Sequence, residues 1–365
     1  RRPPRSTQGV SSAASDVYKR QIRFITKSEG RRRPHFGPSS QKVYLSGNTL
    51  TSITLDGKET RTEAKLVSNS SPAELRMNSK GTHVLAINRS FIELYQISQN
   101  NSNDINLASS VTIKVNRDSP NHVVWSGNGE YIMASSGIEL QTVSVESPNE
   151  SPKIQQLNVA VPRPAPDGIV ALRNARVITM NGYEIIDKAD LVIKGDRILR
   201  VGKSGSVKIP RKAVEFDMSD KFIVPGFIDI HSHFMLNNEL PEPESTVSFA
   251  NLAYGFTSLR NPQSSADIFG FSDMIEIDSV PGPRIFSTGP GLFSNTSFSS
   301  PALAKGVITP YREKYKTHLL KWYLAGPRSE RLAFIKASRE LMILKTTEGG
   351  ADTKHNITYG IDGFS

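Results

Sequence analysis

Two histidines, His231 and His233, stand two residues apart directly after the apolar run FIVPGFIDI. If that run is a β-strand, residues i and i+2 project to the same face, so both imidazoles can bind one divalent cation at about 2.0–2.1 Å. A His-x-His pair considered without its context is more often a surface coincidence than a metal site. The elements around the pair therefore decide how it is interpreted.

Strands and helices alternate after Gly226. The expected strands are 227–234, 256–261, 284–289, 317–324 and 344–350, and the expected helices are 249–254, 266–277 and 328–342. In the last helix, Leu332, Ile335 and Met342 stand at helical spacing and are expected to face the sheet. This alternation predicts a parallel sheet, and its rhythm favours a (β/α)₈ barrel of which about five strands are present.

A different pattern precedes these elements. The segments 171–180, 189–202 and 213–226 alternate apolar and polar residues between Gly-Asp and Ser-Asp turns, which predicts a small antiparallel sheet. Ahead of it, Pro162, Pro164 and Pro166 indicate an extended linker between domains.

The region 22–160 consists of short predicted strands between Gly, Ser and Asn turns. PHFGPSSQKVYLSG is echoed by ELRMNSKGTHVLAI and by VVWSGNGEYIMASS, each with a bulky apolar residue, a small polar turn and an apolar strand. The spacing is close to the length of a four-stranded propeller blade, about 40–45 residues. We predict propeller-like blades, and an irregular β-sandwich is the alternative.

Charge and composition exclude several classes. Of the formal net charge of +10, +8 lies in residues 1–33, so no basic face is expected on a folded domain and we predict no nucleic-acid binding. The chain has no cysteine, which excludes disulfides and Cys-ligated zinc. No apolar run reaches the roughly 18 residues of a membrane span. The segment SSAASDVYKRQ resembles translated adapter sequence, so we expect residues 1–21 to be a non-native or disordered leader.

Several stretches together resemble the amidohydrolase superfamily, in the branch related to imidazolonepropionase that carries an N-terminal TolB-like region. They are ALRNARVITMNG with VIKGDRILRVG, VPGFIDIHSHF, LAYGFTSLRNPQ, PGPRIFSTGPGLF and TTEGG. The resemblance covers roughly residues 22–365, although the Ser-Pro-Asp-Gly turn typical of TolB blades is degenerate in every copy. It implies a multidomain protein with all-β propeller-like blades, a small β-sandwich and an incomplete (β/α)₈ TIM barrel.

The resemblance also implies a ligand set. His231 and His233 match the pair that binds the more buried metal, and Lys321 resembles the carboxylated lysine that bridges two metals. Carboxylation requires a neutral amine and hence a buried lysine with a depressed pKa; a solvated surface lysine is the alternative. Glu348 stands where the family often has a ligand histidine, and we weigh it as a metal ligand against a supporting or structural acid.

Two further residues have weaker assignments. Asp229 is expected to point toward the barrel interior, where it would orient a ligand imidazole or make a structural hydrogen bond. His355 is expected in an exposed loop beyond the last predicted strand. The family's strand-six histidine and strand-eight aspartate have no counterpart before Ser365, so the chain is interpreted as a truncated fragment that binds metal weakly and turns over nothing.

The implied function is metal-dependent hydrolysis of carbon–nitrogen bonds in small-molecule amides, with one or two divalent ions, most simply zinc. The alternatives are a prolidase-like or phosphotriesterase-like hydrolase with the same site, and a non-catalytic protein that binds a protein or ligand through the β-propeller region. The expected boundaries are 1–21 leader, 22–160 TolB-like blades, 161–168 linker, 169–225 composite β-sandwich and 226–365 first half of the barrel. The TolB-like region suggests a periplasmic or secreted protein by analogy alone, so localisation stays open.

Overall fold

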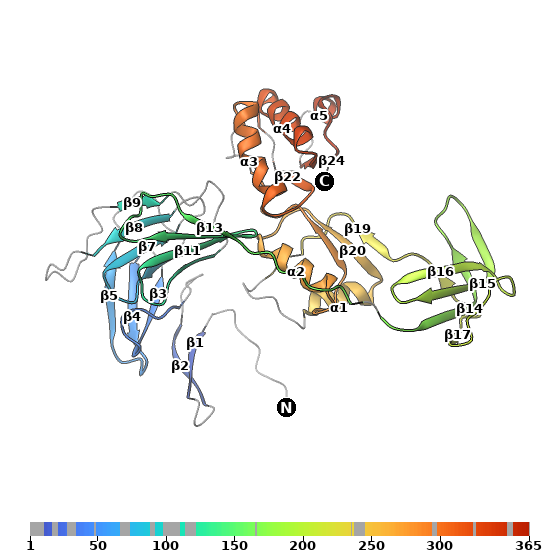
Figure 1. Cartoon of the computed structure of the whole chain (residues 1–365), viewed down its shortest axis with the longest axis horizontal. Helices are drawn as coiled ribbons and strands as arrows, with labels where there is room; N and C mark the ends of the chain where they lie inside the picture. Colours follow the sequence, from blue (N-terminus) through green and yellow to red (C-terminus); the bar gives the residue numbers. More distant parts are fainter. Residues whose placement is uncertain are drawn as a thin grey trace. The chain divides into compact units, whose positions relative to one another are not determined.

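The computed structural model describes residues 11–16, 21–27, 34–46, 49–65, 74–87, 92–97, 110–113, 122–164, 166–234, 236, 245–293, 298–323, 326–348 and 353–364. The chain divides into two units, Arg1–Asn158 and Val159–Ser365. In its described part the first unit consists of strands, whereas the second combines a five-stranded sheet with parallel strands that alternate with helices (Figure 1).

Three antiparallel sheets follow one another in the N-terminal unit, and in each the spatial order of the strands is their order in the chain. The first contains β3 (Lys42–Ser46), β4 (Thr49–Thr54) and β5 (Thr60–Lys65). The second contains β6 (Glu74–Met77), β7 (His83–Ile87), β8 (Ile92–Gln96) and β9 (Ser110–Ile113). The third contains β10 (His122–Trp125), β11 (Tyr131–Ser136), β12 (Glu139–Ser144) and β13 (Lys153–Gln156).

Equivalent turns of the second and third sheets share a conformation. Gly81 follows β6 and Gly129 follows β10, both at φ +70°, a left-handed value that glycine adopts without steric cost. The two turns also contact each other, because Ser79 Oγ donates to Gly127 O at 3.0 Å. The repeated sequence pattern therefore produces repeated structural units that pack side by side.

An apolar core lies between these two sheets. Leu85 and Ile92 from the second sheet pack with Ile132 and Val143 from the third. One face of each strand supplies these side chains, as the alternation of apolar and polar residues predicts. Whether such units are blades of a propeller, rather than layers of a sandwich, stays a prediction.

The structure differs from the expectation for the leader. Ser11–Asp16 forms strand β1, which pairs antiparallel with β2 (Gln21–Lys27). Backbone pairing of this kind needs no apolar side-chain pattern, which was the signal whose absence led us to exclude the segment. Residues 1–10 and 17–20 lie outside the described part of the chain.

The small sheet after the linker is mixed, so the purely antiparallel prediction is wrong. Its strands are β14 (Ile169–Ile178), β15 (Ile185–Lys194), β16 (Arg197–Lys203), β17 (Val214–Asp217) and β18 (Phe222–Ile223). β14, β15 and β16 pair antiparallel, but β17 and β18 both pair parallel to β14. Residues 204–213 cross over to the free edge of β14 instead of forming a hairpin, which keeps β17 in the direction of β14.

Parallel strands and helices alternate after this sheet, as predicted. The strands are β19 (Phe227–Asp229), β20 (Phe256–Asn261), β21 (Arg284–Ser287), β22 (Leu319–Trp322), β23 (Leu344–Thr347) and β24 (Gly363–Phe364). They form two three-stranded parallel sheets, β19-β20-β21 and β22-β23-β24. A parallel bridge between Leu292 and Trp322 joins the chain that follows β21 to β22.

The connecting helices are α1 (Thr246–Ala253), α2 (Asp267–Glu276), α3 (Pro301–Glu313), α4 (Arg328–Glu340) and α5 (Thr353–Tyr359). Ser300 caps α3 by accepting from Leu303 N, and Pro301 suits the first turn because it has no N–H to leave unpaired. The predicted buried face of α4 is partly wrong. Ile335 is 1% exposed, but Leu332 is 37% and Met342 72% exposed.

Phe334 rather than Leu332 completes the buried face of α4 and packs in a cluster with Trp322 and Phe298. The helix is therefore rotated by about one residue relative to the prediction. Within the described residues the six parallel strands form no closed barrel. The search for a helix long and apolar enough to cross a membrane found none in the described part of the chain.

Candidate metal centre

The two histidines follow the strand instead of lying within it. β19 ends at Asp229, so the predicted strand 227–234 is too long. Parallel pairing nevertheless continues locally, because Ser232 N donates to Arg260 O at 3.0 Å. Asp229 Oδ1 accepts from His231 N at 2.9 Å and holds the start of this turn. Asp229 therefore makes a hydrogen bond to the backbone, which is the structural one of its two predicted roles.

The imidazoles of His231 and His233 face each other. Their Nε2 atoms are 3.3 Å apart, and the ring centroids are 5.1 Å apart. Two nitrogens bound at about 2.0–2.1 Å to one tetrahedral ion lie about 3.3–3.4 Å apart, because the angle between the bonds is about 109°. The observed separation thus fits two ligands of one cation. His231 is half-buried and His233 is exposed, which leaves the pair accessible.

Lys321 lies on β22 with a side chain that is 0% exposed. Its Nζ is 3.3 Å from Glu348 Oε2, and Glu348 follows directly after β23. Burial lowers the pKa of Lys321; the nearby Glu348 raises it and Arg260 lowers it further, with a net fall. The burial of Lys321 matches the buried alternative, and the lowered pKa makes the neutral amine easier to form than in a solvated lysine.

The histidine pair and the lysine interact electrostatically. Burial lowers the pKa of His231, and the charges of Lys321 and His233 lower it further, while Glu348 opposes them. A lowered pKa keeps the imidazole neutral at pH 7, and the neutral form is the one that binds metal. Residues far apart in the sequence therefore lie close enough for their charges to act on His231.

Glu348 lies beside Lys321, but the two histidines and Glu348 do not converge as a set. Among the residues that the structure describes, no three His, Cys, Asp or Glu side chains are grouped closely enough to hold a metal ion. In the present arrangement the histidine pair supplies two nitrogens, and Glu348 contacts the lysine.

Two residues of this site were not singled out from the sequence as chemically active. Arg260 from β20 donates to Ile230 O at 3.3 Å and to Thr346 Oγ1 at 2.6 Å, which ties the histidine turn to β23. Tyr323 follows β22, and Lys321 Nζ lies 4.7 Å from the centre of its ring. Burial and the charge of Glu348 raise the pKa of Tyr323. Arg260 lies in the quoted stretch LAYGFTSLRNPQ, where its position at the end of a strand could have marked it.

His355 lies outside this arrangement. It belongs to α5 and not to a loop, and its Nδ1 is 3.2 Å from Arg328 Nη2. Its ring also lies beside that of Tyr359, with ring centroids 6.3 Å apart.

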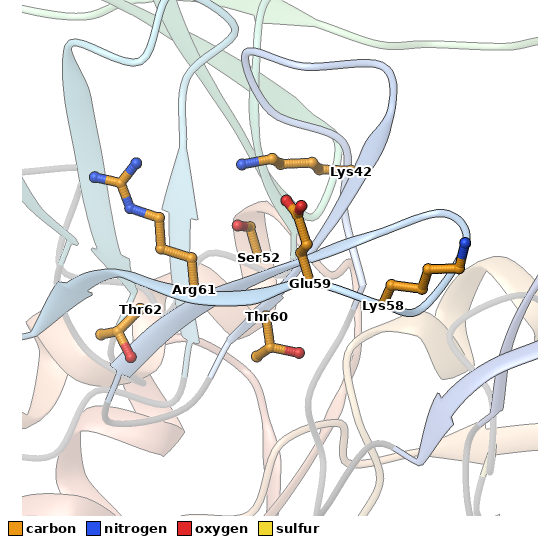
Figure 2. A pocket seen from close by; sticks show the side chains of 7 residues that line it. All are labelled: Lys42, Ser52, Lys58, Glu59, Thr60, Arg61 and Thr62. Carbon is orange, nitrogen blue, oxygen red and sulfur yellow. The ribbon is translucent and has the colours of Figure 1, made fainter.

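A surface hollow in the N-terminal unit offers a different chemistry (Figure 2). It is lined by Lys42, Ser52, Lys58, Glu59, Thr60, Arg61 and Thr62. Lys42 Nζ and Arg61 Nε each lie 3.8 Å from a Glu63 oxygen, and Lys58 Nζ lies 3.6 Å from Asp56. The basic groups therefore already have acidic partners, and the hollow is no candidate for the metal.

Comparisons with known proteins give partial similarities. No protein-family model matches the chain. A segment of 102 residues, 28% of this chain, is 38% identical to an adenine deaminase of Clostridium acetobutylicum and covers 16% of it. A segment of 92 residues, 25% of this chain, is 32% identical to a dihydroorotase of Caldicellulosiruptor saccharolyticus and covers 21% of it. The chain thus spans about a fifth or less of the length of these curated relatives.

Among solved structures, a Xaa-Pro dipeptidase with bound methionine in its active site superposes with a TM-score of 0.43 and 18% identity. The superposition covers 54% of this chain and 61% of the dipeptidase.

Proposed function

We propose that the chain is part of an amidohydrolase-superfamily enzyme that hydrolyses carbon–nitrogen bonds with the help of a divalent cation. The separation of 3.3 Å between the Nε2 atoms of His231 and His233 carries this proposal, because it suits two ligands of one ion. The partial similarity to an adenine deaminase and a dihydroorotase supports it independently, since both names denote chemistry at carbon–nitrogen bonds.

The residues around the pair suit such a cation. His231 and His233 would bind it through Nε2, and zinc is the ion that this imidazole geometry favours most. A bound divalent cation supplies a Lewis acid that activates water near neutral pH. Asp229 holds the backbone of His231, and Arg260 holds the backbone of Ile230, so both residues keep the histidine turn in place.

Lys321 would contribute as a carbamate. In this reaction the neutral amine forms a carbon–nitrogen bond with carbon dioxide, a π electron pair moves onto an oxygen, and the nitrogen loses a proton to solvent, so that the amine becomes an anionic oxygen ligand. Burial of Lys321 and its lowered pKa favour the neutral amine that the reaction requires. Glu348 would then lie near a second anion, and binding of a second cation between the two would relieve their repulsion. This arrangement would make Lys321 and Glu348 ligands of a dinuclear site.

The finer architecture belongs to the same proposal. We interpret β19 to β24 as consecutive strands of a (β/α)₈ barrel, with the candidate site at their carboxyl ends, where barrel enzymes have their active sites. The three antiparallel sheets would be TolB-like propeller blades, and the mixed sheet 169–225 would be the composite β-sandwich.

Zinc uptake tests the proposal directly. The purified chain would be loaded with Zn²⁺, freed of excess metal by gel filtration, and analysed by inductively coupled plasma mass spectrometry. We expect the wild type to retain a measurable amount of zinc and His231→Ala and His233→Ala to lose most of it, because each variant leaves a single imidazole. His318→Ala is the matched control, since His318 lies outside the site beside Arg312.

Unchanged zinc content in His231→Ala and His233→Ala would exclude the assigned ligands. Circular dichroism of each variant separates lost metal from lost fold, because the exposed imidazole of His233 contributes little to packing.

A further inference from the structure

The ring of Tyr323 is fixed on several sides. Its backbone N–H donates to Leu292 O at 2.7 Å, so the residue extends the bridge between β22 and the chain after β21. The ring stacks on Phe293 with centroids 5.2 Å apart and planes inclined by 17°. Gly291 lies against the ring edge, where a Cβ would come within 3.1 Å of Tyr323 Cε2. The position of the phenol is therefore set by packing and by backbone pairing.

Among the residues that the structure describes, the hydroxyl of this fixed ring has no hydrogen-bond partner. It is buried, and no donor or acceptor among the described residues contacts it. Buried tyrosine hydroxyls usually find a partner, because burial without one costs free energy. Tyr311 of the same unit follows this rule, since its hydroxyl donates to Pro290 O at 2.5 Å. The hydroxyl of Tyr323 therefore makes no hydrogen bond that stabilises the described part of the fold, and it can donate to a bound molecule.

The unused donor lies at the candidate metal centre. Lys321 Nζ is 4.7 Å from the centre of the Tyr323 ring, and the charges of Glu348 and Arg260 both act on the Tyr323 hydroxyl. Tyr323 comes two residues after Lys321, just beyond the carboxyl end of β22. Tyr323 therefore lies at the carboxyl edge of these parallel strands, the edge at which α/β enzymes bind their ligands.

We propose that Tyr323 is a catalytic residue whose hydroxyl donates a hydrogen bond to the oxygen of the scissile carbonyl group. This inference rests on the proposed function and extends it from the cation to the substrate. When water attacks the carbonyl carbon, a carbon–oxygen bond forms and the carbonyl π electrons move onto the carbonyl oxygen. As these electrons return, the carbon–nitrogen bond breaks, and the leaving nitrogen takes up the proton that the water gives up. The hydroxyl stabilises the growing charge and keeps its proton, so no other reactant is required.

Acetohydroxamate is a suitable probe, because it binds zinc through two oxygens, one of them a carbonyl oxygen. Its affinity would be measured by isothermal titration calorimetry on the zinc-loaded full chain and on Tyr323→Phe, which removes only the hydroxyl. We expect equal zinc content and at least ten-fold weaker acetohydroxamate binding in Tyr323→Phe. A tyrosine ultraviolet difference signal on binding should be present in the wild type and reduced in the variant.

Tyr311→Phe is the matched control, because its hydroxyl has a structural partner. It should lower the melting temperature and leave the affinity for acetohydroxamate unchanged. Equal affinity in wild type and Tyr323→Phe, or no binding to either zinc-loaded chain, overturns the role of Tyr323 while zinc uptake still supports the proposed function. Absence of zinc uptake by the wild type overturns both.

Discussion

The turns of the N-terminal sheets and the carboxyl ends of the parallel strands treat buried polar groups in opposite ways. In the turn after β6, Asn78 is 1% exposed and uses both ends of its amide. It accepts from Thr82 N and His83 N and donates to Gly129 O. At the end of β22, Lys321 is also buried, but its partner Glu348 is 3.3 Å away and the neighbouring Tyr323 hydroxyl has none among the described residues.

This difference separates buried polar groups that stabilise the fold from buried polar groups that are available to bind a ligand or take part in a reaction. A buried polar group with complete hydrogen bonds stabilises one conformation, whereas an incompletely paired one costs free energy. Proteins retain such costs mostly where a ligand or a reaction uses them. The comparison therefore directs attention to the strand ends of the second unit, and the variants below test it.

The largest expected difference in stability is between variants of two buried lysines on neighbouring strands. Lys345 on β23 is 3% exposed and donates through Nζ to Asp362 at 2.7 Å, so Lys345→Met breaks a close ion pair. We expect it to cost about 3 kcal/mol, because Asp362 loses its partner. Lys321→Met should change stability by less than about 1 kcal/mol, because burial already disfavours the charged form of Lys321, and its 3.3 Å contact with Glu348 is longer than the contact of Lys345 with Asp362. Urea denaturation measures both values.

The zinc content of the two lysine variants should also differ. Lys321→Met should weaken zinc retention, and Lys345→Met should retain zinc as long as it is folded. If Lys321→Met proves as destabilising as Lys345→Met while holding its full zinc content, then Lys321 is a structural residue.

Asn78→Ala addresses the opposite side of the comparison. We expect a loss of about 2 kcal/mol in stability, because two backbone N–H groups and the Gly129 carbonyl lose a buried partner. Asn128→Ala is the control, as that side chain bonds in an exposed turn and should cost less than about 0.5 kcal/mol. The two values come from urea denaturation, and zinc content should stay at the wild-type level in both variants. If Asn78→Ala lost less stability than Asn128→Ala, the hydrogen bonds of Asn78 would not be what stabilises this turn.

Asp190→Asn on β15 gives the smallest expected loss of stability, and this loss depends on pH. Burial alone would raise the pKa of Asp190. Hydrogen bonds from Arg173, Asn174 and Ser204 and the positive charge of Arg173 outweigh this effect, so the pKa of Asp190 is lowered overall. The ionised form therefore stabilises the folded sheet above the unfolded pKa of about 3.9, and this contribution disappears as pH falls through the folded value. We expect Asp190→Asn to cost about 1 kcal/mol at pH 6 and less at pH 3.

Thermal unfolding of Asp190→Asn at the two pH values checks this expectation. Asp187→Asn serves as the control, because the carboxylate of Asp187 is 73% exposed and its contact with Arg176 should contribute little. A destabilisation by Asp190→Asn that grows as pH falls would have the wrong sign and would refute the argument.

Much of the secondary structure was predictable because its signals are local. The strand 256–261 was predicted with its observed bounds, and the helices 266–277 and 328–342 with ends within two residues. The rotation of α4 was not predictable, because Leu332 and Phe334 are both apolar and only the neighbouring Trp322 and Phe298 select Phe334. The direction of β17 likewise depends on a crossover, which alternation along the strand does not reveal.

By itself the sequence determined that two histidines stand two residues apart after an apolar strand, and that a lysine and a glutamate end later strands. Only the tertiary structure decided that the imidazole nitrogens lie 3.3 Å apart, that Lys321 is buried beside Glu348, and that Tyr323 has an unused hydroxyl. The physical reason is that residue type and spacing fix which groups are available. Distance, burial and hydrogen-bond satisfaction arise when parallel strands distant in the sequence become neighbours.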